Sequence, residues 1–159
     1  MSAQKPGVVL KAADIAGKQR TFQHPWGTQS EITGARLGAR TGLERTGVNL
    51  FRVGPGKDSF VLHAHRTEEE WLYILSGRAV VIMDGVEHEV GPGDFVGFPA
   101  PSVAHQLRNP FDVEVVYLCG GENRPFEIVD YPEHGRIGVR HGEDFRTLPA
   151  EAAKPFPER

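Results

Sequence analysis

Glycine and proline recur at short intervals through the middle of this chain, and this spacing limits the folds that it can adopt. GPG at 54–56, Gly77, Asp84-Gly85 and GPGD at 91–94 separate short segments rich in Val, Ile, Leu, Phe and Tyr. Short apolar segments between turn residues are typical of an all-β sandwich or barrel. We therefore predict an all-β fold for the stretch that begins at Asn49.

The turn residues also predict where the strands lie. The predicted strands are Asn49–Val53, Ser59–His65, Glu70–Leu75, Ala79–Met83, Val86–Val90, Asp94–Phe98, and His105–Asn109 leading into Val113–Cys119. Asp84-Gly85 predicts a type I′ hairpin turn, and Pro92-Gly93 suits the centre of a type II turn. Gly77 is predicted to close another hairpin. After Gly120 the pattern weakens, with one more strand expected at Phe126–Val129 and a turn at YPEHG.

A chain of 159 residues fits one domain of ordinary size with a core of its own. Within it we predict three parts. Residues 1–47 form an N-terminal extension that packs on the barrel or on a dimer partner. Residues 48–119 form the barrel, and residues 120–159 form a C-terminal segment with a short irregular tail.

Composition and charge argue against several classes of protein. The formal net charge of −3 argues against a general nucleic-acid binder, which usually carries a basic face. No apolar run approaches the roughly 18 residues that span a bilayer, and the start MSAQKPGVVLKAAD does not resemble a secretory signal. A single cysteine allows no intrachain disulfide. We therefore expect no nucleic-acid partner, no membrane association and a cytoplasmic location.

The segment HAHRTEEEWLYILSG carries residues that suit a metal site. Residues two apart on a strand point to the same face, so His63 and His65 would present two imidazoles side by side. RTEE is a polar turn, and a glutamate from it would begin the neighbouring strand. His105, which begins a strand further along, offers another donor. Because a turn separates the acids from the histidines, alternation alone does not choose between Glu69 and Glu70.

These residues resemble the two sequence motifs of the cupin superfamily. The first motif, a glycine, His-x-His, a glutamate and a second glycine, is matched here by Gly56, His63, His65, Glu70 and Gly77. The second motif is matched by Gly93, Pro99, His105 and Asn109. Pro101 stands where the family has glycine, and His105 comes one residue late after Pro99. The resemblance covers about residues 48–119 and is strongest to small, uncharacterised bacterial single-domain cupins.

The resemblance implies a cupin double-stranded β-helix, which is a jelly-roll barrel. The family's spacing to Gly77 selects Glu70 over Glu69. It also implies one divalent transition metal ion (Zn, Mn, Fe or Ni) held by His63, His65, Glu70 and His105, a set that does not choose among these metals. Cupins commonly pair, so we expect a homodimer in which residues 8–32 lie against the partner barrel.

A site of this kind predicts a small-molecule ligand with one or two oxygens for the metal and a modest apolar body. The residues predicted to line its pocket are Val61, Leu72, Ile74 and Leu107. The first interpretation is a metal-dependent enzyme acting on a small oxygenated metabolite, either a sugar or sugar-phosphate isomerase or a dioxygenase. The alternatives are a metal-dependent sensor or carrier without turnover, and a barrel in which the metal is purely structural. A cupin without metal is the remaining interpretation.

No catalytic residue beyond the predicted ligands is identified. Glu68 and Glu69 are interpreted as solvated turn residues, and Cys119 as a buried core residue, because a reactive thiolate needs an accessible, electropositive setting. Asn109 is predicted to fix a turn. His24 is interpreted as a surface residue, with a weaker alternative in which the HPWG segment folds over the barrel mouth.

Overall fold

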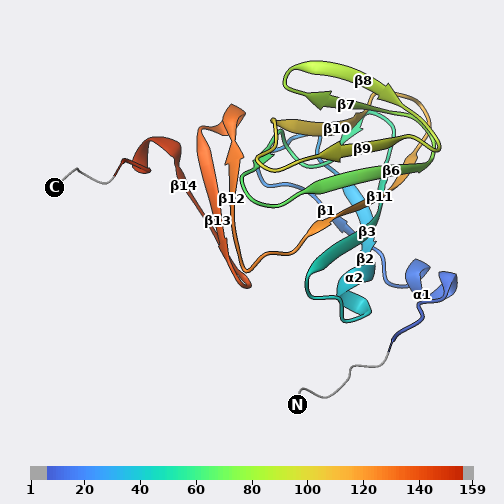
Figure 1. The fold of residues 1–159 in the computed structure, drawn as a ribbon. Helices are drawn as coiled ribbons and strands as arrows, with labels where there is room; N and C mark the ends of the chain where they lie inside the picture. The colour runs from blue at the N-terminus through green and yellow to red at the C-terminus, as the bar shows by residue number, and fades with distance from the viewer. Residues whose placement is uncertain (1–6, 156–159) are drawn as a thin grey trace, which may run out of the picture.

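Two antiparallel sheets face each other and enclose the main hydrophobic core (Figure 1). The structure is a computed structural model that describes residues 7–155. The first sheet has the order β1 (Arg20–Phe22), β2 (Ile32–Arg36), β3 (Thr46–Val53), β11 (Val115–Glu122), β6 (Glu70–Ser76) and β9 (Phe95–Phe98). The second has the order β4 (Lys57–Asp58), β10 (His105–Asn109), β7 (Ala79–Met83) and β8 (Val86–Val90).

A third antiparallel sheet lies at one side of this barrel, and its last three strands along the chain are drawn in orange in Figure 1. Its strands are β14 (Asp144–Pro149), β13 (Arg136–His141), β12 (Phe126–Tyr131) and β5 (Ala64–His65). The strands therefore continue well past Gly120, where the sequence pattern weakens. Because β5 carries one of the predicted ligands, the third sheet attaches directly to the candidate site.

The helices are short, as expected for an all-β chain. They are α1 (Ala12–Ala16), α2 (Leu37–Arg40) and the 3₁₀ turns Pro132–His134 and Ala150–Ala152. No helix in residues 7–155 is long and apolar enough to cross a membrane. The last four residues of the predicted tail lie outside the described part of the chain.

Alternating side chains of the facing sheets build the core. Along β6, Leu72 and Ile74 are buried whereas Tyr73 and Leu75 are exposed, which is the alternation that the sequence predicts. Leu107 of β10 and Val81 of β7 meet them from the second sheet. The main cluster consists of Ile32, Val53, Leu72, Ile74, Ala79, Val81, Val90, Val96, Phe98, Leu107, Val115, Tyr117 and Cys119.

Several predicted turns and connections have the expected geometry. Asp84 and Gly85 both have positive φ, at 50° and 78°, as a type I′ turn between β7 and β8 requires. Gly93 has φ of 93°, which suits the third position of a type II turn. Asn109 is buried and fixes the turn after β10: its side-chain amide donates to the carbonyls of Val53 and Val113, and its Oδ1 accepts from the amide of Phe111.

Two predictions about the backbone are wrong. Gly77 does not close a hairpin, because β6 and β7 belong to different sheets; it lies at the crossing between them with φ of 76°. Ser59–His65 is not one strand. Lys57 and Asp58 pair with β10, the chain bulges away from β10 between Ser59 and His63, and Ala64 and His65 then pair with β12 of another sheet.

Replacing Gly77 with alanine should destabilise the fold strongly. A Cβ at this position would lie 2.2 Å from the carbonyl oxygen of Glu114, and the positive φ adds strain. The matched control is Gly85→Ala, where φ is also positive but nothing lies within 4 Å of the added Cβ. We expect Gly85→Ala to cost about 1–2 kcal/mol, and Gly77→Ala to cost about 1–3 kcal/mol more, measured by urea unfolding. Equal losses in the two variants would contradict the steric argument.

Candidate metal centre

His63, His65, Glu70 and His105 converge from three elements at one end of the barrel. Each offers one donor atom, and these atoms all lie within 4.8 Å of one another. The backbones of His63 and His105 are joined by a pair of hydrogen bonds of 3.2 and 2.8 Å. His65 lies on β5 and Glu70 begins β6. The structure therefore brings together all four predicted residues, including His105 after its lengthened turn.

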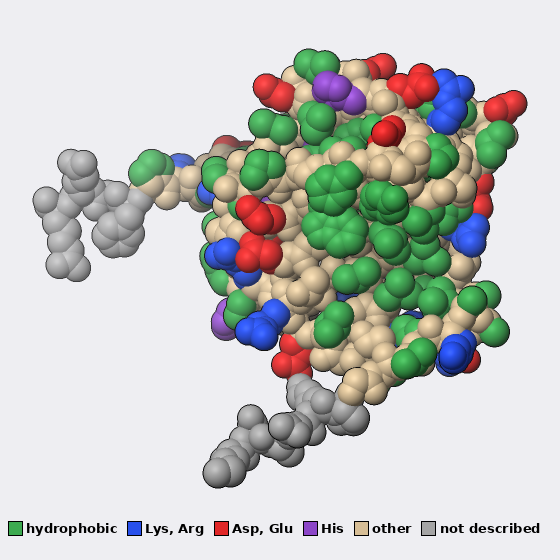
Figure 2. All heavy atoms as spheres, turned by 45° about the vertical axis from the view of Figure 1, so that its right-hand side comes forward, with side chains coloured by type: hydrophobic (Ala, Val, Ile, Leu, Met, Phe, Trp, Pro, Cys, Tyr) green, Lys and Arg blue, Asp and Glu red, His purple; other side chains and the backbone are tan. Residues whose placement is uncertain are grey.

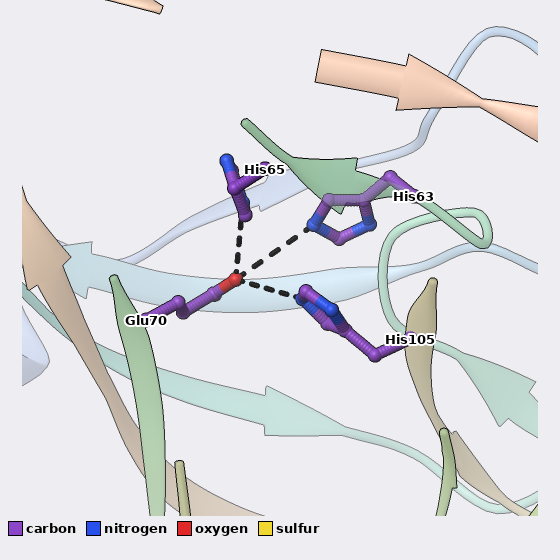
Figure 3. A group of neighbouring side chains, drawn as sticks. All are labelled: His63, His65, Glu70 and His105. Carbon is purple, nitrogen blue, oxygen red and sulfur yellow. Dashed lines mark hydrogen bonds and ion pairs between the residues drawn. The ribbon is translucent and has the colours of Figure 1, made fainter. Parts of the chain in front are cut away.

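One carboxylate oxygen is the meeting point of the three imidazoles (Figure 3). The Nε2 atoms of His105 and His65 lie 3.0 and 3.1 Å from Oε2 of Glu70, and that of His63 lies 3.8 Å away. The other carboxylate oxygen of Glu70 accepts a hydrogen bond of 3.0 Å from the thiol of Cys119. Cys119 is buried as predicted, and it also helps to hold this carboxylate.

The rings of two histidines are fixed by their own backbone. Nδ1 of His63 donates to the carbonyl of Val61 at 2.8 Å, and Nδ1 of His105 donates to the carbonyl of Val103 at 2.9 Å. The ring of His105 also stacks on Phe98, with 3.7 Å between centroids. A proton held at Nδ1 leaves the Nε2 lone pair for a metal ion.

The ring of His65 is held differently. Its Nδ1 is buried without a hydrogen-bond partner, and the nearest acid is Glu127 of β12, with Oε1 at 3.8 Å. Glu127 is itself almost fully buried, at 1% exposure. It accepts hydrogen bonds from the amides of Arg66 and Thr67 and from the Thr67 hydroxyl. The group nearest Nδ1 of His65 is therefore a carboxylate, whereas Nδ1 of His63 and of His105 faces a backbone carbonyl.

The electrostatics of the cluster favour an ionised carboxylate. Burial alone would raise the pKa of Glu70, but hydrogen bonds from His105, His63 and His65 hold it well below its ordinary value. Burial lowers the pKa of His63. Burial also lowers that of His65, but the hydrogen bond to Glu70 and the charges of Glu70, Glu127 and Glu68 outweigh it, so the pKa of His65 is raised.

This donor set fits a divalent transition metal. Three imidazole nitrogens and one carboxylate are ligands that Zn, Mn, Fe and Ni accept, and they face one point in space. The Nδ1 hydrogen bonds of His63 and His105 orient their rings for coordination through Nε2. His63, His65, Glu70 and His105 could therefore hold such an ion.

A cavity of about 320 Å³ adjoins the cluster and reaches the third sheet. Its lining residues are His24, Asn49, Phe51, Phe60, His63, His65, Glu68, Glu70, Cys119, Glu127, Val129, Tyr131, Arg140 and Phe145. Phe145 is 47% exposed, so the cavity extends to the protein surface. His24 lies in its wall, whereas Trp26 of the same segment packs on Val61, Val129 and Tyr131.

The four residues predicted to line the pocket lie elsewhere. Leu72, Ile74 and Leu107 belong to the main core, where Leu72 and Leu107 border a space of about 20 Å³ beneath the cluster. Val61 packs with Val129, Tyr131 and Trp26 in a second, smaller cluster. Phe60 lines the larger cavity in their place.

The prediction for Glu68 is wrong. This residue is not solvated but 6% exposed, because it accepts hydrogen bonds from the amide of Arg124 and from the guanidinium of Arg140. Sequence analysis also missed Glu127, Tyr131, Arg140 and Phe145. All four come from the third sheet, where no motif or strong alternation identified them.

The sequence profile of the cupin domain matches residues 49–121, which include all four clustered residues. Over nearly its whole length the chain is also similar to a proposed sugar phosphate isomerase from Acidithiobacillus ferrooxidans. The identity is 30%, the alignment covers 94% of this chain and 97% of the other, and the TM-score is 0.87. The chain belongs to the cupin superfamily.

Two further comparisons name different activities for similar proteins. A structure of a sugar phosphate isomerase from a cupin superfamily, from Silicibacter pomeroyi, is 28% identical; the alignment covers 94% of this chain and 97% of that one, with a TM-score of 0.82. Quercetin 2,3-dioxygenase of Bacillus subtilis is 35% identical over 86 residues, which are 53% of this chain and 26% of that enzyme. The chain spans only 53% and 26% of the lengths of the two curated relatives that it matches.

Proposed function

We propose that this cupin binds one divalent transition metal ion through His63, His65, Glu70 and His105, and that it is a metal-dependent enzyme acting on a small oxygenated metabolite. One observation carries the proposal: four donor atoms within 4.8 Å of one another lie beside a cavity of about 320 Å³. Such a cavity is large enough for a small ligand. The cavity therefore favours a site that a ligand can reach over a metal ion with a purely structural role.

When bound, such an ion supplies Lewis-acid chemistry or, if it is redox active, chemistry with O2. The chain's own residues would orient the ion and the substrate. His63 and His105 are held by backbone carbonyls, Glu70 by the Cys119 thiol, and the aromatic side chains of the cavity exclude water from the substrate. The names of similar proteins support both an isomerase and a dioxygenase.

A metal-dependent binding protein without turnover is the second candidate. Apart from the proposed ligand Glu70, the cavity wall has two carboxylates, and both are already engaged: Glu127 by the amides of Arg66 and Thr67, and Glu68 by Arg124 and Arg140. Neither is therefore free to act as a general base. This observation favours a sensor or carrier over an enzyme that needs a proton acceptor beyond the metal ligands.

We also propose a homodimer and a cytoplasmic location. Hydrophobic side chains gather across one face of the barrel (Figure 2), and Tyr73, Leu75 and Phe95 of β6 and β9 are exposed. The ring of Trp71 stacks on Phe95, with 6.0 Å between centroids. A second copy of the chain would remove this apolar surface from water. The location rests on the single cysteine, which requires no oxidising compartment.

Removing two predicted ligands should abolish metal binding. We expect protein purified without chelator to carry one divalent ion per chain by elemental analysis, and His63→Ala with His65→Ala to carry none. The variant should keep the β-sheet circular dichroism of the parent, because both rings lie outside the main core. His88→Ala with His141→Ala, two exposed histidines, is the matched control and should keep the ion. Metal retained by the His63/His65 variant would overturn the proposed site.

The exposed apolar face should control association. We expect the protein to sediment as a dimer at micromolar concentration, and Tyr73→Glu with Phe95→Glu to sediment as a monomer, because two charges would be buried unpaired in the interface. Val86→Glu, at an exposed position in the other sheet, should leave the dimer intact. A parent protein that is monomeric under these conditions would rule out the proposed dimer.

A further inference from the structure

Aromatic rings from separate parts of the chain form much of the cavity wall. Phe51 comes from β3, Phe60 from the bend before β5, Tyr131 from β12 and Phe145 from β14. The rings of Phe51 and Phe60 lie 6.0 Å apart between centroids, and the ring of Tyr131 lies 6.3 Å from that of His63. A ligand that reaches the four donors would therefore contact ring faces and edges.

Apart from the ion itself, the side-chain charges of the same wall do not suit a phosphate group. Among the lining residues that the structure describes, Arg140 is the one arginine or lysine, and Glu68 and Glu127 lie in the wall with it. Arg140 is not free: its Nη2 donates to Glu68 and to the carbonyl of Arg124. Its Nε is buried without a hydrogen-bond partner. A phosphate group held away from the ion would meet Glu68, Glu127 and one guanidinium whose Nη2 already donates to Glu68, so no cationic clamp besides the ion would hold it.

We propose that this cavity takes a small compound with a planar unsaturated ring and two adjacent oxygens, neutral in solution and releasing its hydroxyl proton to solvent when both oxygens bind the ion, and not a phosphate ester. This inference rests on the proposed function, because the two oxygens would bind the ion held by the four donors. The ring would lie among Phe51, Phe60, Tyr131 and Phe145, where aromatic contacts stabilise a flat ligand. A volume of about 320 Å³ suits one such compound.

Calorimetric titration of the zinc-loaded protein tests the ligand class. Zinc is redox-inert, so no reaction with O2 accompanies binding. The probes are maltol, a hydroxypyranone that is neutral in solution and releases its hydroxyl proton to the buffer on binding zinc, and D-ribose 5-phosphate, whose recovery unchanged is checked after the titration. Metal analysis after each titration verifies that zinc stays bound. We expect maltol to bind at least about tenfold more tightly than the sugar phosphate. Equal or tighter binding of ribose 5-phosphate would overturn the ligand class but leave the proposed function standing, whereas failure to load zinc would overturn the proposed function.

Two ring variants test the wall itself. Phe60→Ala should weaken maltol binding about three- to tenfold at unchanged zinc content. Because Phe60 also packs on the core, Phe145→Ala is the second variant; its ring is 47% exposed, so the fold should tolerate the change. Phe126→Ala, at an exposed position of β12 outside the cavity lining, is the control and should bind maltol like the parent. Unchanged affinity in both Phe60→Ala and Phe145→Ala would overturn the ring contact.

A second inference follows from a different observation, the uneven support of the three imidazoles. His63 and His105 each have a backbone carbonyl at Nδ1, whereas His65 has the buried carboxylate of Glu127 at 3.8 Å. Glu127 is held in place by Arg66, Thr67 and the pairing of β12 with β5. We infer that Glu127 is a positioning residue for His65, which keeps the proton at Nδ1 and so presents Nε2 to the metal.

Glu127→Gln tests this role, because glutamine has the same shape and still accepts from the Arg66 amide but carries no charge. We expect zinc to bind about 10- to 100-fold more weakly, measured by chelator competition. In the zinc-loaded parent the Nδ1 proton of His65 should resonate downfield and exchange slowly, and Glu127→Gln should shift it upfield. Glu122→Gln, an exposed carboxylate paired with Arg124, is the control and should change neither.

A purely structural role for Glu127 predicts a different result. It would lower the urea midpoint of the metal-free protein and leave the zinc affinity and the His65 resonance unchanged, which would overturn the inference. Should Glu127→Gln fail to fold, Glu127→Asp keeps the charge but draws it away from the ring. We expect Glu127→Asp to bind zinc more weakly than the parent and the Glu122→Gln control, but more tightly than a His65→Ala variant. Zinc affinity equal to that of the parent would also overturn the inference.

Discussion

Three imidazole nitrogens face one carboxylate oxygen, and the closure of the barrel brings these groups together. Glu70 and His105 are 35 residues apart in the chain, yet Nε2 and Oε2 lie 3.0 Å apart. This contact requires that the two sheets close around their core, because Glu70 lies on the first sheet and His105 on the second. Burial in the closed barrel is costly for a charged group, and the three histidines offset that cost for Glu70.

Turn residues and the alternation of apolar side chains predicted most strands of the barrel, and short motifs identified the four candidate donors. Asp84-Gly85 needs two positive φ values wherever it occurs in a hairpin, and the alternation of Leu72, Tyr73, Ile74 and Leu75 defines one buried face without reference to the rest of the fold. The choice of Glu70 over Glu69 needed the family's spacing. The position of the Glu70 carboxylate depends on how strands far apart in the sequence pair across the barrel. A short sequence segment does not predict that pairing.

The bend at residues 59–63 explains most of what the sequence could not predict about the cavity. Strict alternation placed Val61 with the histidines and Phe60 on the other side. The chain bulges away from β10 between Ser59 and His63 before it pairs with β12, so Phe60 lines the cavity and Val61 packs with Trp26. Glu68 was misread for a related reason. Its partners Arg124 and Arg140 are 56 and 72 residues away, so its burial depends on long-range contacts.

The candidate site has two parts, one inside the segment that the cupin profile covers and one beyond it. All four donors lie within residues 49–121, which the cupin profile covers, whereas Glu127, Tyr131, Arg140 and Phe145 lie beyond it. Selection can therefore alter what these proteins recognise by changing the C-terminal strands while the metal chemistry stays constant. Proteins that share the four donors can thus differ in substrate, and an activity transferred between them on the motif alone takes no account of the cavity residues that lie beyond it.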